Sequence, residues 1–346
     1  MLLLDVVSKK EVQKVPFWFM RQAGRYLPEY MEIRNKSREN GMNFLGMCYD
    51  VETASEITLQ PIRRFNMSAA IVFSDILVVP HAIGWNVEFQ EGIGPVLEKF
   101  QSEEDLKLLS RNRGYEKYEI VGNVIANVRS KLAKDKALIG FSGCPFTLAC
   151  YMIDGGGSKD FIKTQKMLYE NEHLFEHLIE VLADSVGDYL EVQINHGANI
   201  VQLFDSHAGL LHGEMYEKYI INQNRKITNR IKQKYPNIPV ICFPKNSGIL
   251  YQHFANNVPC DVISLDNSAS CGFFSNAIES QVLQGNLNNY LLCYGKEKDI
   301  IASAEKIIHH FRKGGKSFIF NLSHGMLKDA KMQNVEALVD FLQQYQ

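Results

Sequence analysis

One pattern recurs along this chain and restricts its fold: a short apolar run ends in small or polar residues, and a stretch with helical spacing follows. Eight such runs can be distinguished, at residues 16–20, 69–73, 137–141, 199–204, 239–243, 262–265, 282–283 and 317–322. Most are apolar throughout rather than alternating, which is typical of parallel strands covered on both faces. Helical spacing is clearest at residues 174–186, and residues 213–234 and 299–312 are also expected to be helical.

Eight strand–helix units favour a closed barrel over an open doubly wound sheet, because neither a dinucleotide fingerprint nor a Walker A motif follows the first run. The length of 346 residues would suit two average domains, yet α/β barrels exceed about 250 residues as one unit. The sequence therefore predicts an α/β protein in which residues 1–346 form a single (β/α)8 TIM-type barrel domain. Polar residues follow the runs, so the active site is expected at the C-terminal ends of the strands.

Charge and cysteine content restrict the partners and the compartment. The net charge of −2 provides no general field for nucleic acid or anionic lipid, so an acidic ligand would need a local cluster of Arg or Lys. The seven cysteines form no C-x-x-C pair, which indicates free thiols in a reducing compartment. The apolar start of the chain is too short for a signal peptide, and no run of 18 uncharged apolar residues occurs. We expect a cytoplasmic protein with no nucleic-acid or membrane partner.

The densest group of polar residues follows the first run. Arg21 and Arg25 are four residues apart, and both can face one cavity if the chain turns at Gly24. The planar guanidinium binds carboxylate or phosphate through two hydrogen bonds, so this segment is a candidate acid-binding loop. The alternative is an ordinary surface loop in which the two arginines pair with Glu29 or Glu32.

Two further candidates follow apolar strands. Asp75 ends an apolar run, so its ionised carboxylate would need donors or a positive charge, although an Asp here could also cap the next helix. Tyr151 falls on the second turn of a helix that Pro145 begins, where a packed core aromatic is the commoner role. Ser206-His207 and Ser323-His324 follow two other runs. Adjacent residues on an extended strand point to opposite sides, so neither pair is expected to form a nucleophile–base dyad.

Two motifs resemble functional sites without the necessary context. His173 and His177 match an H-x-x-E-H pattern and could bind zinc from one helix face. No carboxylate partner stands out further along the chain, and we interpret the motif as a chance pattern rather than a metal site. The glycine-rich residues 154–159 lack the Gly-Lys-Ser/Thr order of a phosphate loop and no strand precedes them, so a flexible or ligand-covering loop is favoured.

Several of these segments together resemble one known family. They are residues 18–30 (Trp-Phe-Met-Arg-Gln-Ala-Gly-Arg-Tyr-Leu-Pro-Glu-Tyr), 73–77, 140–159, 205–209 and 320–325, in the same order over nearly the whole chain. In these segments the chain is similar to the uroporphyrinogen decarboxylase family. The resemblance implies a (β/α)8 fold and a cytoplasmic homodimer. It also implies removal of the four acetate carboxylates of uroporphyrinogen III, to give coproporphyrinogen III for haem biosynthesis, without cofactor or metal.

The resemblance also implies roles for particular residues. It makes Asp75, Arg21 and Tyr151 the catalytic candidates, with Asp75 receiving the pyrrole N–H groups and stabilising a protonated pyrrole. The proton donor stays open between Arg21, Tyr151 and water, because an Arg gives up a proton reluctantly. The substrate-binding residues implied are Arg21, Gln22, Ala23, Gly24, Arg25, Arg34, Asp75, Tyr151, Ser206 and His324.

The chain departs from the family pattern at four positions. Ser323 stands where a Gly usually precedes the last His, and Lys328 replaces a Pro. Asn267 occupies the place of a Trp, and Asn288 that of an Asp. These changes affect the expected loop geometry rather than the central residues.

Two other functions remain to be weighed. A zinc-dependent methyltransferase acting on a corrinoid or thiol shares this architecture, but its usual His-x-Cys ligand pair does not occur here. A non-catalytic tetrapyrrole-binding protein would keep the cavity, and the presence of Asp75 argues against it.

Overall fold

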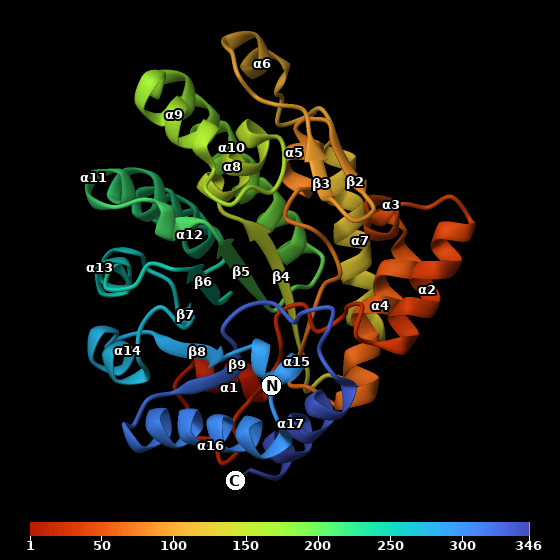
Figure 1. Cartoon of the computed structure of the whole chain (residues 1–346), viewed down its shortest axis with the longest axis vertical. Coiled ribbons are helices and arrows are strands. Elements are labelled where there is room, and N and C mark those ends of the chain that lie inside the picture. Colours follow the sequence, from red (N-terminus) through yellow and green to blue (C-terminus); the bar gives the residue numbers. More distant parts are fainter. Residues whose placement is uncertain (346) are drawn as a thin grey trace.

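The computed structural model describes residues 1–345, and a seven-stranded parallel sheet lies at its centre. Neighbouring strands follow the order β1-β4-β5-β6-β7-β8-β9, and the sheet curls with helices on its outer side (Figure 1). The strands are β1 Ala69–Ile71, β4 Ala137–Gly143, β5 Ile200–Asp205, β6 Val240–Pro244, β7 Val262–Ser264, β8 Val282–Leu287 and β9 Phe318–Leu322. The α/β class and seven of the eight predicted strands are thus confirmed.

The first predicted strand, residues 16–20, is the exception, and the sheet is not a closed eight-stranded barrel. This segment lies between β9 and β1, but it forms only one parallel bridge, from Phe17 to Phe320. Backbone hydrogen bonds join it to Phe320 and Ser68, but side chains replace two others that a regular strand would make. Ser68 Oγ accepts from the N–H of Phe17, and Asn321 Oδ1 from that of Met20. The prediction of a regular strand was wrong because apolar content records burial, not the partner of each N–H group.

Helices surround the sheet, and the longest predicted ones are confirmed. Residues 174–186 lie in α10, whose apolar stripe is buried, and residues 299–312 lie in α16, whose C-cap is Gly314. Residues 213–234 are helical throughout, as α11, a π-helical turn and α12. The bounds are α1 Leu2–Val7, α2 Pro28–Glu39, α3 Phe44–Tyr49, α4 Val51–Phe65, α5 Val78–Ala82, α6 Glu103–Leu108, α7 Tyr115–Lys131, α8 Pro145–Asp154, α9 Ile162–Glu170, α10 Glu172–Asn195, α11 Gly213–Tyr216, η2 Glu217–Ile221, α12 Asn222–Lys234, α13 Leu250–Asn257, α14 Cys271–Ala277, α15 Tyr290–Tyr294, α16 Glu297–Lys313 and α17 Met332–Gln344, with a short 3₁₀ turn at Ala208–Leu210.

A small antiparallel hairpin stands apart from the main sheet. It consists of β2 (Val87–Gln90) and β3 (Gly94–Leu97), and the glycine-rich loop after α8 lies against it through a bridge between Gly156 and Val96. A Cβ at Gly156 would come within 2.7 Å of the Pro95 carbonyl oxygen, so the glycine permits this close contact. The loop therefore packs on the hairpin and does not have the geometry of a phosphate-binding loop.

Polar side chains also occur inside the sheet. Trp18 donates from Nε1 to Gln284 Oε1 at 2.9 Å, and the amide of Gln284 donates to Ser264 Oγ at 3.1 Å. These bonds tie residues 16–20 to β7 and β8, and so fix the start of the loop that follows. Within residues 1–345, we find no helix with the length and apolar content needed to cross a membrane.

Candidate active site

A cavity of about 830 Å³ opens at the C-terminal ends of the strands. It gathers side chains that are far apart in the sequence, from the loop after residue 20, the segment after β1, helix α8, the end of β5 and the loop after β9. All ten residues predicted to form the site line it, namely Arg21, Gln22, Ala23, Gly24, Arg25, Arg34, Asp75, Tyr151, Ser206 and His324.

The arginine-containing loop is held by its own buried amide. Gln22 is 1% exposed; its Oε1 accepts from the N–H of Phe19 at 3.1 Å and its Nε2 donates to the carbonyl of Ala69 at 3.1 Å. Tyr26 adds a hydrogen bond from its hydroxyl to the Gln22 carbonyl at 2.7 Å. The amide of Gln22 thus braces the loop against β1, although the residue also borders the cavity.

The last loop approaches Arg21 closely. The N–H of Met326 donates to the carbonyl of Met20 at 2.7 Å, which joins the two loops. A Cβ added to Gly325 would lie 2.6 Å from Cδ of Arg21, so only a glycine leaves room for the arginine in this position. Arg21 itself has a positive φ of 58°, a conformation that costs an ordinary residue free energy and that the surrounding contacts maintain.

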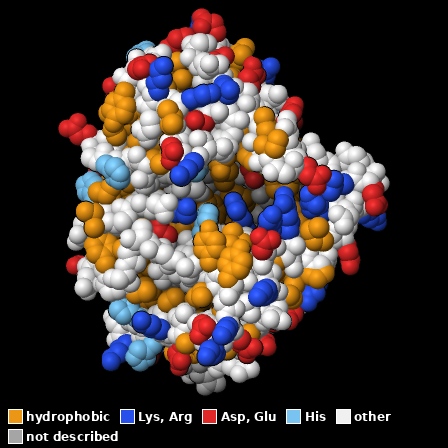
Figure 2. Space-filling model, in the orientation of Figure 1, with side chains coloured by type: hydrophobic (Ala, Val, Ile, Leu, Met, Phe, Trp, Pro, Cys, Tyr) orange, Lys and Arg blue, Asp and Glu red, His pale blue; other side chains and the backbone are white. Residues whose placement is uncertain are grey.

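Positive charge lines one side of the cavity. Figure 2 shows Lys and Arg side chains gathered along the hollow of this face. Glu29 pairs with Arg64 rather than with the loop, and in residues 1–345 Arg21 and Arg25 form no ion pair. Arg34, by contrast, forms an ion pair with Glu91, with 3.7 Å between Nη2 and Oε1. The two loop arginines are therefore available to an acidic ligand, as the acid-binding interpretation predicts.

Asp75 provides a buried carboxylate facing these cations, whereas Glu91, which also lines the cavity, is 65% exposed and pairs with Arg34 and Arg38. Its Oδ1 accepts from the N–H of Leu77 at 2.9 Å, and the side chain does not cap α5, whose N-cap is Leu77. Burial raises the pKa of Asp75 to about 6, while the Leu77 N–H and the charge of Arg21 oppose that rise. Asp75 is therefore ionised at neutral pH but takes up a proton just below it.

Tyr151, Ser206 and His324 complete the wall. Burial and the Asp75 carboxylate raise the pKa of Tyr151, and Arg21 counteracts this effect. Burial, together with Lys245 and Arg21, lowers the pKa of His324 to about 3. Burial and Lys245 lower the pKa of neighbouring His207 to about 4, so both imidazoles are neutral in the working range.

The two Ser-His sequences form no catalytic dyad. In the part of the chain that the structure describes, no hydrogen bond joins Ser206 to His207 or Ser323 to His324, and Nε2 of His207 is buried without a partner. The His207 ring instead packs at a tilt against Tyr151 and Phe161, at centroid distances of 5.5 and 4.3 Å. This arrangement agrees with the expectation that adjacent residues on a strand end point apart.

Behind the cavity, Asp205 ties β5 to α8 and α12. It accepts from Thr147 Oγ1 at 2.7 Å and from Asn224 Nδ2 at 3.2 Å, and burial raises its pKa to about 6. Thr147 Oγ1 also accepts from the N–H of His207, so this network orients the segment that carries Ser206. Its role is to position that segment, because Asp205 does not line the cavity.

Comparison with known proteins assigns the family. A family model described as uroporphyrinogen decarboxylase matches residues 1–345. The chain is 43% identical over 333 residues to a uroporphyrinogen decarboxylase of Rickettsia rickettsii (strain Sheila Smith), covering 96% of this chain and 94% of the relative. The chain belongs to the uroporphyrinogen decarboxylase family. A Rickettsia bellii (strain RML369-C) uroporphyrinogen decarboxylase is also 43% identical, over all of this chain and 99% of its own.

Solved structures support the fold at much lower identity. A methyltransferase from Methanosarcina mazei superposes with a TM-score of 0.75 at 16% identity, over 99% of this chain and 97% of its own. A B12-independent methionine synthase from Shewanella sp. W3-18-1 gives 0.53 at 8% identity, over 85% of both chains. At these identities the likeness concerns the fold alone, so the family match rather than the architecture distinguishes a decarboxylase from a methyltransferase.

In this member of the uroporphyrinogen decarboxylase family, the cavity has an aromatic wall that the sequence analysis did not predict. Phe44 packs against Phe73 and Phe89 at centroid distances of 5.7 and 4.7 Å, and all three line the cavity. They come from α3, the segment after β1 and the hairpin, so no local pattern connects them. Arg38 also lines the cavity one turn after Arg34, a spacing that could have extended the basic series.

The four departures from the family pattern occupy different places. Lys328 lies on the cavity rim, where it adds a cation in place of the usual Pro. Ser323 is buried, with its N–H bonded to the Leu287 carbonyl at 2.8 Å. Asn267 and Asn288 are exposed and do not line the cavity. Of the four, Lys328 is therefore the substitution that bears on ligand binding.

Proposed function

We propose that this chain is the carboxy-lyase that removes the four acetate carboxylates of uroporphyrinogen III, giving coproporphyrinogen III for haem biosynthesis. The observation that carries the proposal is a buried ionisable carboxylate, Asp75, in the same cavity as Arg21 and Arg25, which form no ion pair within residues 1–345 of this family member. An octa-acid with four inward pyrrole N–H groups needs both features. The cavity supplies cations for its rim and an acceptor for its centre.

The substrate is bound through its carboxylates by charged side chains and through its rings by apolar ones. Arg21, Arg25 and Arg34 are assigned to the propionate and acetate groups, because a guanidinium holds a carboxylate through two short hydrogen bonds. Ala23 and Gly24 line the same loop and leave space for these groups. The wall of Phe44, Phe73 and Phe89 covers the faces of the pyrrole rings, and Ser206 and His324 complete the contacts. Because His324 stays neutral, it acts as a hydrogen-bonding group rather than as a cation.

The chemistry uses the pyrrole as the electron sink. A proton adds to the ring carbon next to the acetate-bearing position and leaves a ring cation. The bond between the acetate methylene and its carboxylate then breaks, CO2 leaves, and the electron pair neutralises the cation. A proton adds to the exocyclic carbon to form the methyl group, and the ring carbon loses its proton. Each carboxylate removed thus consumes one net proton and needs no redox partner.

Asp75 lowers the energy of the cation formed in the first step. A carboxylate about 4 Å from a unit positive charge, at an effective dielectric of about 20, contributes about 4 kcal/mol. That corresponds to roughly a thousandfold in rate. The stabilisation is electrostatic and preorganised, because the carboxylate is in place before the charge develops. The proton reaches the ring from the part of the wall that Arg21 and Tyr151 share, directly or through a water.

The domain organisation, oligomeric state and compartment of the enzyme belong to the same proposal. Residues 1–346 act as one domain, and one continuous buried core from Leu3 to Leu342 supports this. The family resemblance supports a cytoplasmic homodimer whose decarboxylation reaction uses neither cofactor nor metal.

The direct test is incubation of the purified protein with uroporphyrinogen III under anaerobic, reducing conditions. Products are oxidised to porphyrins and separated by their number of carboxylates. We expect the eight-carboxylate substrate to disappear through intermediates with seven, six and five, ending at four. Tight binding of the substrate with no loss of carboxylates would instead identify a non-catalytic tetrapyrrole-binding protein and refute the proposal.

A further inference from the structure

A cluster outside the cavity brings together three potential metal ligands. His173 and His177 lie one turn apart at the start of α10, with ring centroids 4.1 Å apart. Glu103, about 70 positions earlier in the chain, begins α6 and lies with its Oε1 3.9 Å from Nδ1 of His173. One ligand atom from each residue lies within 4.8 Å of the other two. The carboxylate that the H-x-x-E-H pattern lacks in the sequence is thus supplied by a separate helix.

The surroundings leave these three side chains available. Among residues 1–345, Glu103 has no Lys or Arg partner, whereas Glu172 and Glu176 on α10 both pair with Lys218. The His173–Glu103 separation is too long for a hydrogen bond, so neither side chain is committed to the other. His173 is 74% exposed and Glu103 48% exposed, which gives an ion direct access from solvent.

We propose that Glu103, His173 and His177 form a zinc site that clips α6 to α10. Two imidazole nitrogens and one carboxylate oxygen are ligands that zinc prefers, and a water completes four-coordination. Bonds of about 2.0–2.2 Å in a tetrahedron require ligand atoms about 3.4 Å apart. The three side chains therefore need to close by about an ångström, which exposed Glu and His side chains can do through their torsions.

The position of α6 explains why a metal bond to α10 would stabilise it. This helix has no buried residue, although its N-terminus is well capped by Ser102 and Asp105. Figure 1 shows it protruding at the edge of the molecule, and it contacts α10. It follows the β2–β3 hairpin, whose residues Phe89 and Gln90 line the cavity. A metal bond to α10 would hold this connection where apolar contacts are few.

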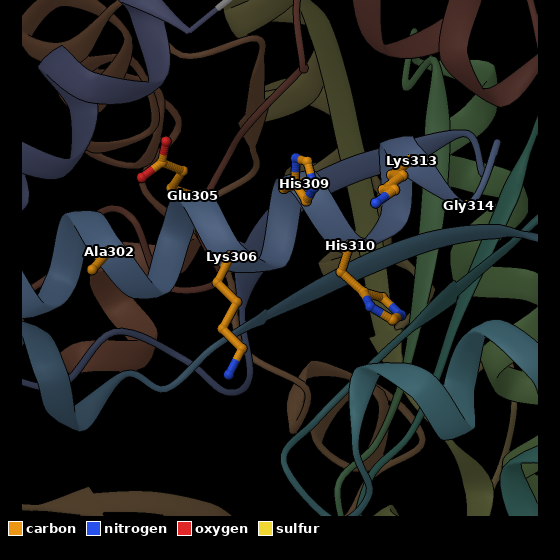
Figure 3. Close-up of a pocket in the computed structure, with 7 residues that line it drawn as sticks. All are labelled: Ala302, Glu305, Lys306, His309, His310, Lys313 and Gly314. Atoms are coloured by element: carbon orange, nitrogen blue, oxygen red, sulfur yellow. The ribbon is translucent and has the colours of Figure 1, made fainter.

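A second histidine cluster serves as the internal control. His309 and His310 lie in a shallow groove on α16 with Glu305, Lys306 and Lys313 (Figure 3). The two imidazoles point to different sides of the helix in Figure 3, and His310 is hydrogen-bonded to Ser275 at 3.1 Å. The two lysines also repel a divalent cation. This groove has histidines without a convergent ligand set, so it should not bind zinc tightly.

The test titrates metal-free protein with zinc chloride against a chelating dye. We expect the wild type to bind one equivalent of zinc. Its affinity should be at least about tenfold higher than that of His173→Ala, His177→Ala or the double variant, because each variant has lost a ligand. His309→Ala should bind as the wild type does. In parallel, zinc should slow amide hydrogen exchange in α6 of the wild type and His309→Ala, but not of the double variant.

The zinc site is refuted if the double variant binds zinc as tightly as the wild type does. It is also refuted if zinc slows hydrogen exchange in α6 equally in the wild type and the double variant. Binding that needs millimolar zinc would also refute it, since such binding is adventitious. Decarboxylase turnover without zinc should be the same in all these variants, because none of the three ligands lines the cavity. The outcome is independent of the proposed reaction, and failure of one leaves the other intact.

Discussion

Replacement of Asp75 by Asn isolates the charge of the carboxylate from its shape. The amide oxygen can still accept from the N–H of Leu77, so the local turn persists. What disappears is the negative charge facing the protonated pyrrole. With about 4 kcal/mol assigned to that charge, turnover should fall about a thousandfold while the KM for uroporphyrinogen changes much less.

The pH dependence gives a second readout of the same residue. The folded-state pKa of Asp75 is about 6, so lowering the pH through 6 neutralises the carboxylate. In the wild type, kcat/KM should therefore fall about tenfold per pH unit below that value. Asp75→Asn should lack this limb. Asp205 also has a pKa of about 6 but lies behind the cavity, so folded Asp205→Asn should retain the limb.

Measurements of the free energy of unfolding show whether Asp75→Asn loses activity through its missing charge or through unfolding. The pKa of Asp75 is raised above its ordinary 3.8, so the folded protein binds this proton more strongly than the unfolded chain does. Between pH 4 and 6, the contribution of Asp75 to the free energy of unfolding therefore decreases as pH rises. Above about 6 the ionised form costs on the order of 3 kcal/mol.

Asp75→Asn removes that cost, so at pH 7.5 its urea midpoint should equal or exceed that of the wild type. Turnover is measured by separating the oxidised porphyrin products by carboxylate number. Near-normal turnover in the folded variant, or an unchanged pH limb, would refute the role assigned to Asp75.

Five further substitutions test the remaining parts of the site. Arg21→Ala and Arg25→Ala should each raise KM about ten- to hundredfold by removing a charge-assisted pair, and unchanged KM in both would contradict the carboxylate clamp. Gly325→Ala should raise KM in the same direction without shifting the urea midpoint, because the new Cβ displaces only the Arg21 side chain; a normal KM would show that Arg21 need not lie there. Gln22→Ala should lower the free energy of unfolding by roughly 3 kcal/mol, since it leaves the Phe19 N–H and the Ala69 carbonyl unpaired, and an unchanged urea midpoint would contradict the bracing role. Tyr151→Phe should lower kcat about a hundredfold if its hydroxyl takes part in proton delivery, whereas an unaltered kcat would remove Tyr151 from the proton path.

The central residues of the cavity could be found from the sequence because each follows a buried apolar run or lies on the helix after one. Asp75 was recognisable as a carboxylate ending an apolar run, and Arg21 and Arg25 as paired cations directly after another. Their meeting in one cavity follows from parallel strands, whose C-terminal ends share one edge of the sheet. The aromatic wall could not be found in this way, because Phe44, Phe73 and Phe89 come from a helix, a strand end and a hairpin.

One expectation was wrong because a local sequence pattern does not determine hydrogen-bond partners, and another feature came from residues far apart in the sequence. Residues 16–20 have the composition of a strand, yet the side chains of Ser68 and Asn321 bond their N–H groups and leave a single bridge. The sequence showed no carboxylate partner for the histidines of the H-x-x-E-H motif. In the structure Glu103 lies near them, because the connection between the hairpin and α7 returns to the start of α10, and the zinc proposal rests on this proximity.

The sequence by itself determined the seven parallel strands, the longest helices, the basic loop and the family, since these depend on neighbouring residues and on motifs read in order. Only the tertiary structure decided that residues 16–20 leave the sheet without an eighth regular strand, which side chains share the cavity and which groups titrate near neutral pH. The pKa values of Asp75 and His324 illustrate the difference: burial raises that of Asp75 against the charge of Arg21, whereas burial and nearby cations both lower that of His324. Burial is a property of the packed molecule, and no single segment carries it.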